Sequence, residues 1–279
     1  MGCAGLAALT VVGPGVPAGP IPDSPPVAAY TTPDTNANPT GRVNGAVRWV
    51  GPFPVAEPIY GLIQTERGSR WTHKPNPFLP WVNVDGLIEG VVVQLKNIDP
   101  KRAKPWTRGL VTVEVDDSAV VARQDGKVDA IAFTKLGEEV ELVSRDKNFN
   151  AIRGRGAAFF TLPFPTPNQP IRRKLDRPGR VEFTSGAGFF WTAADVFVCE
   201  HPYYTLTDSK GHFVLDGVPP GTYEITAWLR PWVITGRDRD PETGRIVRLH
   251  FQEETVATGH VTVPQTGSVS IELTLPAKR

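Results

Sequence analysis

Cysteine is scarce in this 279-residue sequence, which contains Cys3 and Cys199 and no others. Two cysteines cannot form the disulfide framework that holds many small secreted domains together. A bridge between them is not expected, because it would tie a Pro/Gly-rich leader to a strand. Cys199 ends the apolar run 196–199 (VFVC), so we expect it to be a buried, small apolar side chain.

The sequence also lacks a charge excess of either sign, with 30 basic and 29 acidic residues. The basic footprint of a nucleic-acid-binding protein is missing, and no nucleic-acid partner is expected. No long window has apolar residues at helical spacing. There are instead 27 glycines and 28 prolines among many valines, threonines and aromatics, which is typical of short strands joined by tight turns. These features predict an all-β protein of the sandwich type.

The usual motifs of catalysis are missing as well. The sequence has no G-x-S-x-G nucleophile elbow, no HExxH and no phosphate-binding loop. Its five histidines include no pair at a metal-ligand spacing, and we expect His201, which precedes a proline, to cap a turn with a hydrogen bond. The tract 237–244 (RDRDPETG) lacks the spacing of a calcium loop and is typical of a charged hairpin tip. We therefore expect no enzyme activity and no cofactor.

Residues 1–40 form a leader and arm rich in Pro, Gly, Asn and Thr. The apolar run 4–12 is too short to cross a bilayer and has no charged segment before it, so it is not a complete signal peptide. Gly2 and Cys3, followed by a Pro-rich tract, resemble the lipid-attachment junction of bacterial lipoproteins. An ordinary flexible leader is the alternative. The expectation is an exported protein, periplasmic or anchored on the periplasmic or outer side of a membrane, with Cys3 as the candidate lipidation site.

Strand signals begin at 42–50 (RVNGAVRWV), where Val43, Val47 and Trp49 fall on one face. The segments 51–85 and 149–170 are predicted to be irregular. The segment 205–228 is predicted to be a hairpin with a tight turn at 208–211 (DSKG), in which the glycine takes a positive φ. Further strands are predicted at 86–95, 110–115, 128–133, 138–143, 180–184, 193–200, 245–251, 258–263 and 268–275.

The run 201–228 (HPYYTLTDSKGHFVLDGVPPGTYEITAW) resembles the carboxypeptidase regulatory-like domain. It contains both the TD-x-x-G-x-F-x-L stretch and the VPPGTY stretch of that family. The resemblance implies a transthyretin-like β-sandwich of the carbohydrate-binding-like fold. The strands 43–50 and 90–95 look like the opening strands of the same sandwich. That domain would then be discontinuous, 41–104 plus 201–279, with residues 105–200 inserted into it.

The inserted block 105–200 resembles a cupredoxin, and the chain from about residue 41 onward resembles exported bacterial proteins that join a plastocyanin-like domain to a regulatory-like domain. The stretch 137–152 (GEEVELVSRDKNFNAI) matches the cupredoxin strand before the first copper ligand. The resemblance implies a Greek-key β-barrel, with copper held by two His, a Cys and a Met. The aligned positions hold other residues: Phe149 for the first His, Gly186 for the Cys, Phe189 for the second His and Thr192 for the Met. The single methionine of the sequence is Met1, so we expect a barrel without copper ligands.

In a cupredoxin the two ligand-bearing loops lie at the same end of the barrel. The resemblance therefore gathers seven aromatics at that end: Phe149, Phe159, Phe160, Phe164, Phe189, Phe190 and Trp191. Some of them would fill the vacated metal pocket, because protein interiors leave no large void. The remainder would form an exposed apolar surface for a protein partner. The residues expected on that surface are Phe159, Phe160, Phe164, Phe190 and Trp191.

A basic tract, 171–180 (IRRKLDRPGR), carries five cations: Arg172, Arg173, Lys174, Arg177 and Arg180. Two interpretations stay open. The charges protect a strand edge from pairing with other strands. Alternatively, they form a patch for an anionic partner, such as a lipid headgroup, an acidic glycan or an acidic protein face.

These features favour a non-catalytic structural or accessory subunit that docks onto a protein partner in the cell envelope through the aromatic end and the N-terminal arm. A membrane electron-transfer complex is the host that the cupredoxin resemblance suggests. One alternative is a carbohydrate-binding protein in which Trp71, Trp81 and Trp106 stack on sugars. A further alternative is a copper-binding electron-transfer protein, which would need ligands outside the aligned positions.

Overall fold

The computed structural model describes residues 40–276, apart from 54, 66, 67, 118, 148, 187, 243 and 245, and it leaves out the side chains of 61–70, 72 and 74. All described residues belong to one compact unit, Asn38–Arg279. The leader, with the candidate lipidation site Cys3, lies outside the described residues. Throughout the described part the regular structure consists of β-strands, so the prediction of an all-β fold is confirmed. No helix among the described residues is long and apolar enough to cross a membrane.

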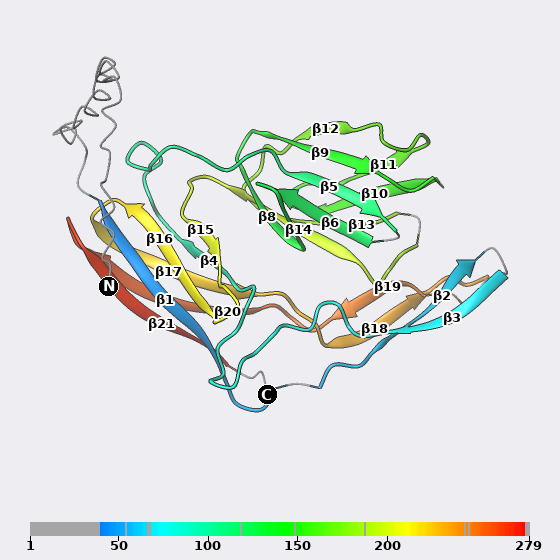
Figure 1. Ribbon diagram of the computed structural model, residues 1–279, viewed down its shortest axis with the longest axis horizontal. Coiled ribbons are helices and arrows are strands. Elements are labelled where there is room, and N and C mark those ends of the chain that lie inside the picture. Colours follow the sequence, from blue (N-terminus) through cyan, green and yellow to red (C-terminus); the bar gives the residue numbers. More distant parts are fainter. Residues whose placement is uncertain are drawn as a thin grey trace, which may run out of the picture. The chain divides into compact units, whose positions relative to one another are not determined.

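Two sheets with a shared core form the first sandwich (Figure 1). One sheet has the order β16-β1-β21, in which β1 (Gly41–Val50) runs parallel to β21 (Ser268–Pro276) and antiparallel to β16 (His212–Val218). The other sheet has the order β15-β4-β17-β20, formed by Tyr204–Leu206, Val92–Leu95, Gly221–Leu229 and Thr255–Val263. Val43 and Val47 pack with Phe213 and Ile225 in the core between them. Along β1, buried residues such as Val43 and Val47 are separated by more exposed ones. This pattern is expected for a sheet with one covered face.

The turn at Asp208–Gly211 forms as predicted. The Asp208 carboxylate accepts hydrogen bonds from the N–H groups of Lys210 and His212, each at 2.9 Å. Gly211 has φ = 76°, and a side chain there would also collide with Leu87. The predicted hairpin at 205–228 is wrong, however. β16 and β17 lie in opposite sheets, because β16 pairs with β1 whereas β17 pairs with β4 and β20.

The strands between Thr112 and Cys199 form a second sandwich of two five-stranded sheets, coloured green to yellow-green in Figure 1. The order β12-β9-β5-β6-β7 comprises Ile171–Lys174, Glu139–Ser144, Thr112–Asp116, Ala119–Gln124 and Lys127–Asp129. The order β11-β10-β13-β14-β8 comprises Phe160–Phe164, Asn150–Gly156, Gly179–Ser185, Ala193–Cys199 and Ile131–Lys135. Val113, Leu142, Ile152 and Val181 are among the fully buried residues of the core between these sheets.

Two further strand pairs stand outside the four sheets. β2 (Ile59–Thr65) pairs with β3 (Gly68–Lys74), and β18 (Ile234–Arg239) pairs with β19 (Ile246–Phe251). The described residues of the tract 237–244 include the end of β18 and its tip, where the Gly244 N–H donates to the Asp240 carbonyl, so the predicted charged hairpin tip is confirmed.

Three segment predictions are wrong in their secondary structure. The segment 51–85, predicted to be irregular, contains β2 and β3, and the predicted loop 149–170 contains β10 and β11. The predicted strand 86–95 is regular only from Val92, because Gly86 and Gly90 have φ values of 78° and 74° and turn the chain.

Candidate functional site

Strand β14 is buried along its whole length and lies between the two sandwiches. Ala194, Val196 and Val198 point into the core of the second sandwich. The alternate residues Phe197 and Cys199 pack instead against Trp228 of β17 and Val92 of β4, which belong to the first sandwich. Since side chains alternate along a strand, Asp195 lies on the same face of β14 as Phe197 and Cys199, toward the first sandwich. β14 therefore carries the contact surface between the sandwiches.

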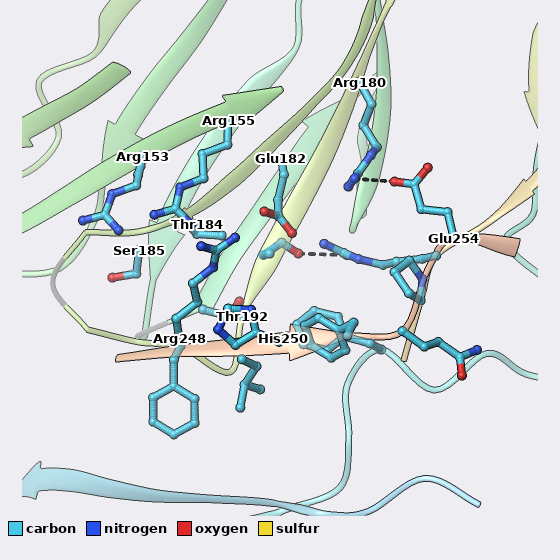
Figure 2. A pocket seen from close by; sticks show the side chains of 18 of the residues that line it. Arg153, Arg155, Arg180, Glu182, Thr184, Ser185, Thr192, Arg248, His250 and Glu254 are labelled. Atoms are coloured by element: carbon cyan, nitrogen blue, oxygen red, sulfur yellow. Dashed lines mark hydrogen bonds and ion pairs between the residues drawn. The ribbon is translucent and has the colours of Figure 1, made fainter. Parts of the chain in front are cut away.

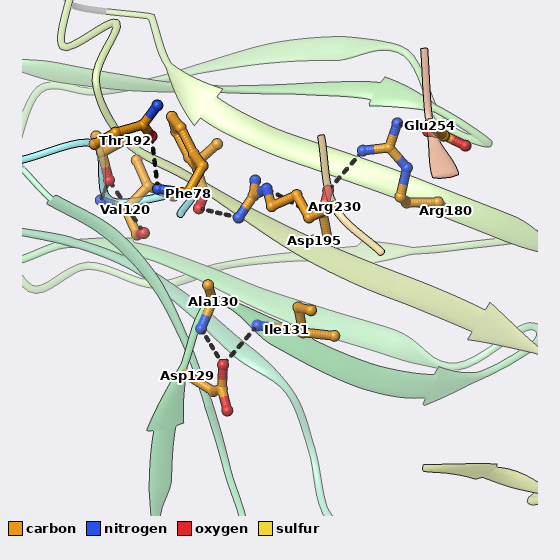
Figure 3. Close-up of polar contacts among 12 residues, drawn as sticks. Phe78, Val120, Asp129, Ala130, Ile131, Arg180, Thr192, Asp195, Arg230 and Glu254 are labelled. Carbon is orange, nitrogen blue, oxygen red and sulfur yellow. Dashed lines mark hydrogen bonds and ion pairs between the residues drawn. The ribbon is translucent and has the colours of Figure 1, made fainter. Parts of the chain in front are cut away.

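Asp195 is completely buried and joins two arginines from different parts of the chain (Figure 3). Its Oδ1 accepts a hydrogen bond from Arg180 Nη1 at 2.9 Å, and its Oδ2 lies 3.2 Å from Arg230 Nε. Arg230 also donates to the Ala193 carbonyl at 3.1 Å, and Arg180 pairs with Glu254. Burial alone lowers the pKa of Arg180, but the charges of Asp195 and Glu254 outweigh it and raise that pKa. This network fixes the end of β17 against β13 and β14.

A cleft of about 310 Å³ opens beside this network (Figure 2). One wall is the outer face of β10 and β13, and the opposite wall is β19 with the segment that follows it. Arg153 and Arg155 come from β10, Thr184 and Glu182 face them from β13, and Arg248 comes from β19. We call this site the arginine cleft. Phe78, Phe190, Leu249 and Phe251 supply apolar lining.

In Figure 2 the side chain of Arg248 extends from β19 toward the guanidinium group of Arg155, and Arg153 lies beside Arg155 on β10. Among the described residues, none of the three forms an ion pair or a side-chain hydrogen bond. Burial, followed by the charges of Arg248 and Arg153, lowers the pKa of Arg155, and Glu182 opposes this change only in part. Five arginines line the cleft, and the carboxylates that line it belong to Glu182, Glu253 and Glu254, so positive charge is in excess.

The sequence pattern did not single out these three arginines. β10 was predicted to be part of a loop, although Ile152 and Gly154 are buried while Arg153 and Arg155 are partly exposed, which is a two-residue period. That alternation was the available signal for two of them. Arg248 joins them only through the placement of β18 and β19, which no local pattern indicates.

The positions aligned with copper ligands make ordinary packing and hydrogen-bond contacts. Phe149 is exposed, and Gly186 packs so closely on Ala151 that a Cβ would lie 2.8 Å from the Ala151 side chain. Phe189 packs on Trp191 with ring centroids 5.4 Å apart, and the Thr192 hydroxyl accepts a hydrogen bond from Val120 N–H at 2.7 Å. No group of three or more potential ligands occurs among the described His, Cys, Asp and Glu residues.

The predicted aromatic surface does not form as a unit. Phe164 and Trp191 are buried, so the expectation that they face a partner is wrong: each fills a core. Phe160 packs on Phe183, and Phe190 packs edge-on against Trp191, each at a partly buried position. Phe159 alone of the five is fully exposed, at 85%.

The basic tract 171–180 is divided between separate environments. β12, which contains Arg172, Arg173 and Lys174, is an edge strand of its sheet. Arg172 lies near Glu139 and Glu141, Lys174 pairs with Asp176 at 3.3 Å, and the Arg173 guanidinium lies 5.6 Å from the Phe160 ring centroid. Arg180 belongs to the Asp195 network, and Arg177 is exposed. This arrangement matches charges protecting a strand edge, and it removes Arg180 from any common patch.

The three tryptophans of the carbohydrate hypothesis lie in different settings. Trp71 on β3 and Trp81 in the following segment are exposed, at 63% and 65%. Trp106 is half-buried against the cluster of Trp228 and Phe197. Trp71 and Trp81 therefore remain accessible to a ligand or partner, and Trp106 belongs mainly to the contact between the sandwiches.

His201 is buried, and its Nδ1 accepts a hydrogen bond from the Tyr203 N–H at 3.3 Å. The expectation that it caps a turn is confirmed. Burial lowers the pKa of its imidazole, which favours the neutral ring that this acceptor role needs. His201 therefore has a structural role at the entry to β15.

Cys199 is buried, as predicted, and burial raises the pKa of its thiol far above neutral pH, although Arg108 opposes this. We expect native protein treated with a maleimide at pH 8 to remain unmodified at Cys199, as measured by peptide mass spectrometry. Val128→Cys, at an exposed strand position, provides a matched reactive control. Equal labelling rates at the two positions would contradict the buried placement.

No protein-family model matches this sequence. A search of curated proteins also finds no significant relative. The function is therefore inferred from the geometry of the arginine cleft and of the exposed aromatic residues.

Proposed function

We propose that this protein is a non-catalytic accessory subunit of the cell envelope that docks onto a protein partner. The observation that carries the proposal is the pair β2–β3, which we call the aromatic ribbon. Its register places Tyr60 opposite His73 and Trp71 two residues away, so the three side chains share one face. Tyr60 and Trp71 are exposed there, and the Tyr60 and His73 rings lie 5.1 Å apart.

A two-stranded ribbon is marginally stable when nothing covers it. The aromatic ribbon pairs with no third strand in the described chain. The segments on either side of the aromatic ribbon in the sequence supply further exposed apolar side chains: Val50, Val55, Leu79, Trp81 and Val84. Trp81 and Val84 line a shallow hollow over Trp49 and Phe53. Exposed apolar residues of this density mark a contact surface in soluble proteins.

This proposal moves the docking surface from the predicted aromatic end to the aromatic ribbon and Trp81. An apolar, aromatic-accepting face of an envelope protein is the partner that this chemistry fits. Export, lipid attachment at Cys3 and a membrane electron-transfer complex as host remain proposals that rest on the sequence resemblances. The exposure of Trp71 and Trp81 also favours a second candidate function, stacking on a carbohydrate.

The test is the native size of the protein extracted gently from its own cells. We expect wild type to migrate with a larger assembly and Trp71→Ala/Trp81→Ala to run alone near its 30.4 kDa mass. Phe159→Ala, which removes an exposed aromatic of the second sandwich, is the matched control and should stay assembled.

Wild type that runs alone would refute the subunit proposal. Binding of wild type, but not of the double variant, to immobilised polysaccharides would then support the carbohydrate alternative. Both tryptophans are largely exposed, so the melting temperature of the double variant should stay close to that of wild type.

A further inference from the structure

The outer face of the sheet β11-β10-β13-β14-β8 is apolar at β8 and cationic at β10. Phe133 and Phe197 make it apolar where it meets Trp228. Asp195 and Arg180 follow, as a matched ion pair. Arg155 and Arg153 come last on β10, opposite Glu182 and Thr184 of β13. The cationic end of this face is the part that opens into the arginine cleft.

The arginines around the arginine cleft fall into two classes. Arg180 and Arg230 are matched by Asp195 and Glu254 and hold the fold together. Arg153, Arg155 and Arg248 form no such pair within the described chain, although β10 and β19 bring them to one cleft. Like charges held together repel one another, and walls of low dielectric strengthen their field in a cleft. An anion bound between the three arginines would reduce this repulsion.

We propose that the arginine cleft binds the phosphate group of a small phosphomonoester through Arg153, Arg155 and Arg248. This inference is independent of docking through the aromatic ribbon. A phosphomonoester carries nearly two negative charges and three terminal acceptor oxygens at neutral pH. Guanidinium groups bind such oxygens in pairs of parallel hydrogen bonds. A carboxylate has one charge and two oxygens, so it matches three converging arginines less well.

The rest of the lining fits the organic part of such a ligand. The cleft volume of about 310 Å³ is at the small end of the range for ligand sites. The Thr184 hydroxyl lies on the same face as Arg153, and Phe78, Phe190 and Phe251 give an apolar side. A ligand of the size of a sugar phosphate would place its phosphate on the arginines and its body along this apolar side.

Titration calorimetry of the full chain at pH 7.5 and low salt tests the proposal, with inorganic phosphate, glucose 6-phosphate and acetate as probes. Wild type is expected to bind the two phosphates and to bind acetate at least tenfold more weakly. Arg155→Gln and Arg248→Gln should each weaken phosphate binding at least tenfold. Glu182→Gln, which removes the opposing charge beside Arg155, should tighten it. Arg177→Gln makes the same charge change at an exposed site outside the cleft and should leave affinity within twofold.

A second experiment distinguishes a lipid headgroup from a soluble phosphate ester. It measures binding of the protein to phosphatidylcholine vesicles that contain phosphatidic acid. Binding to the vesicles and not to glucose 6-phosphate, lost in Arg155→Gln, would assign the site to a lipid headgroup. Binding to glucose 6-phosphate alone would assign it to a soluble ester. The proposal is overturned if no phosphate binds at millimolar concentration, if acetate binds equally well, or if Arg177→Gln weakens binding as much as Arg155→Gln.

Failure of the phosphate-binding proposal can be distinguished from failure of the docking proposal. Trp71→Ala/Trp81→Ala changes no residue of the arginine cleft, so it should bind inorganic phosphate like wild type. Arg155 and Arg248 have no ion pair to lose, so their variants should melt at or above the temperature of wild type. A loss of phosphate binding with an intact fold would therefore be specific to the cleft.

Discussion

Asp195→Asn is expected to lower the free energy of unfolding by about 3–5 kcal/mol, the usual cost of breaking a buried ion pair by removing one partner. The carboxylate is fully buried and neutralises Arg180 and Arg230 together. Asparagine has nearly the same volume but no charge, so both guanidinium groups would lose their shared counter-charge. Arg230, whose side chain is only 11% exposed, would have little access to water in compensation. Urea unfolding followed by circular dichroism measures this change.

Asp176→Asn is the matched control, because Asp176 forms an exposed pair with Lys174 at 3.3 Å. Exposed pairs contribute about 0–1 kcal/mol, so this variant should unfold almost like wild type. Replacing Arg230 by Met in the Asp195→Asn background should recover part of the lost stability, because it removes one uncompensated charge. A loss below about 1 kcal/mol for Asp195→Asn would mean that water or rearrangement satisfies the arginines.

Trp228→Ala is expected to cost about 3–5 kcal/mol, the typical penalty for truncating a large core aromatic. Trp228 is buried at the contact between the sandwiches. Its ring packs edge-on against Phe197 with centroids 5.2 Å apart, and the Arg180 guanidinium lies 5.2 Å from the ring centroid. The substitution therefore removes the aromatic contact and weakens the neighbouring ion pair in the same step.

The loss should also separate the unfolding of the two sandwiches, because each retains a core of its own. Scanning calorimetry should show one transition for wild type and two for Trp228→Ala. Trp71→Ala removes an exposed tryptophan and should keep a single transition. A single, unshifted transition for Trp228→Ala would mean that other contacts join the sandwiches.

The sequence predicted most reliably those strands whose burial alternates or is complete. β1, β14 and β17 were found because their apolar residues face a core on one side or both. Several of the missed strands lie in two-stranded pairs or at sheet edges, where burial imposes little pattern. β10 lies inside its sheet, but its core-facing side includes a glycine and its outer side carries two arginines, so it lacks a clear apolar alternation. β12 consists of one isoleucine and three cations, and β11 contains a proline, which an edge strand tolerates.

The candidate site was harder to predict than the fold. Asp195 could be read as a polar residue inside an apolar run, but its partners come from elsewhere in the chain: Arg180 lies on β13 and Arg230 directly follows β17. Arg248 reaches the cleft from a hairpin whose position depends on tertiary packing. Phe164 and Trp191 were predicted to contact a partner but are buried. Composition alone does not separate an aromatic that fills a core from one that contacts a partner.

The parallel pairing of β1 with β21 has a consequence for synthesis on the ribosome. Arg42 is opposite Ser268, so the three-stranded sheet of the first sandwich cannot be completed until β21 has emerged, long after β1. The strands of the second sandwich are contiguous between Thr112 and Cys199 and can assemble earlier. During that interval β1 presents an unpaired apolar edge, the kind of edge that recruits other chains. We therefore expect closure by β21 to be a slow, long-range step of folding, and the step at which a nascent chain most needs protection from aggregation.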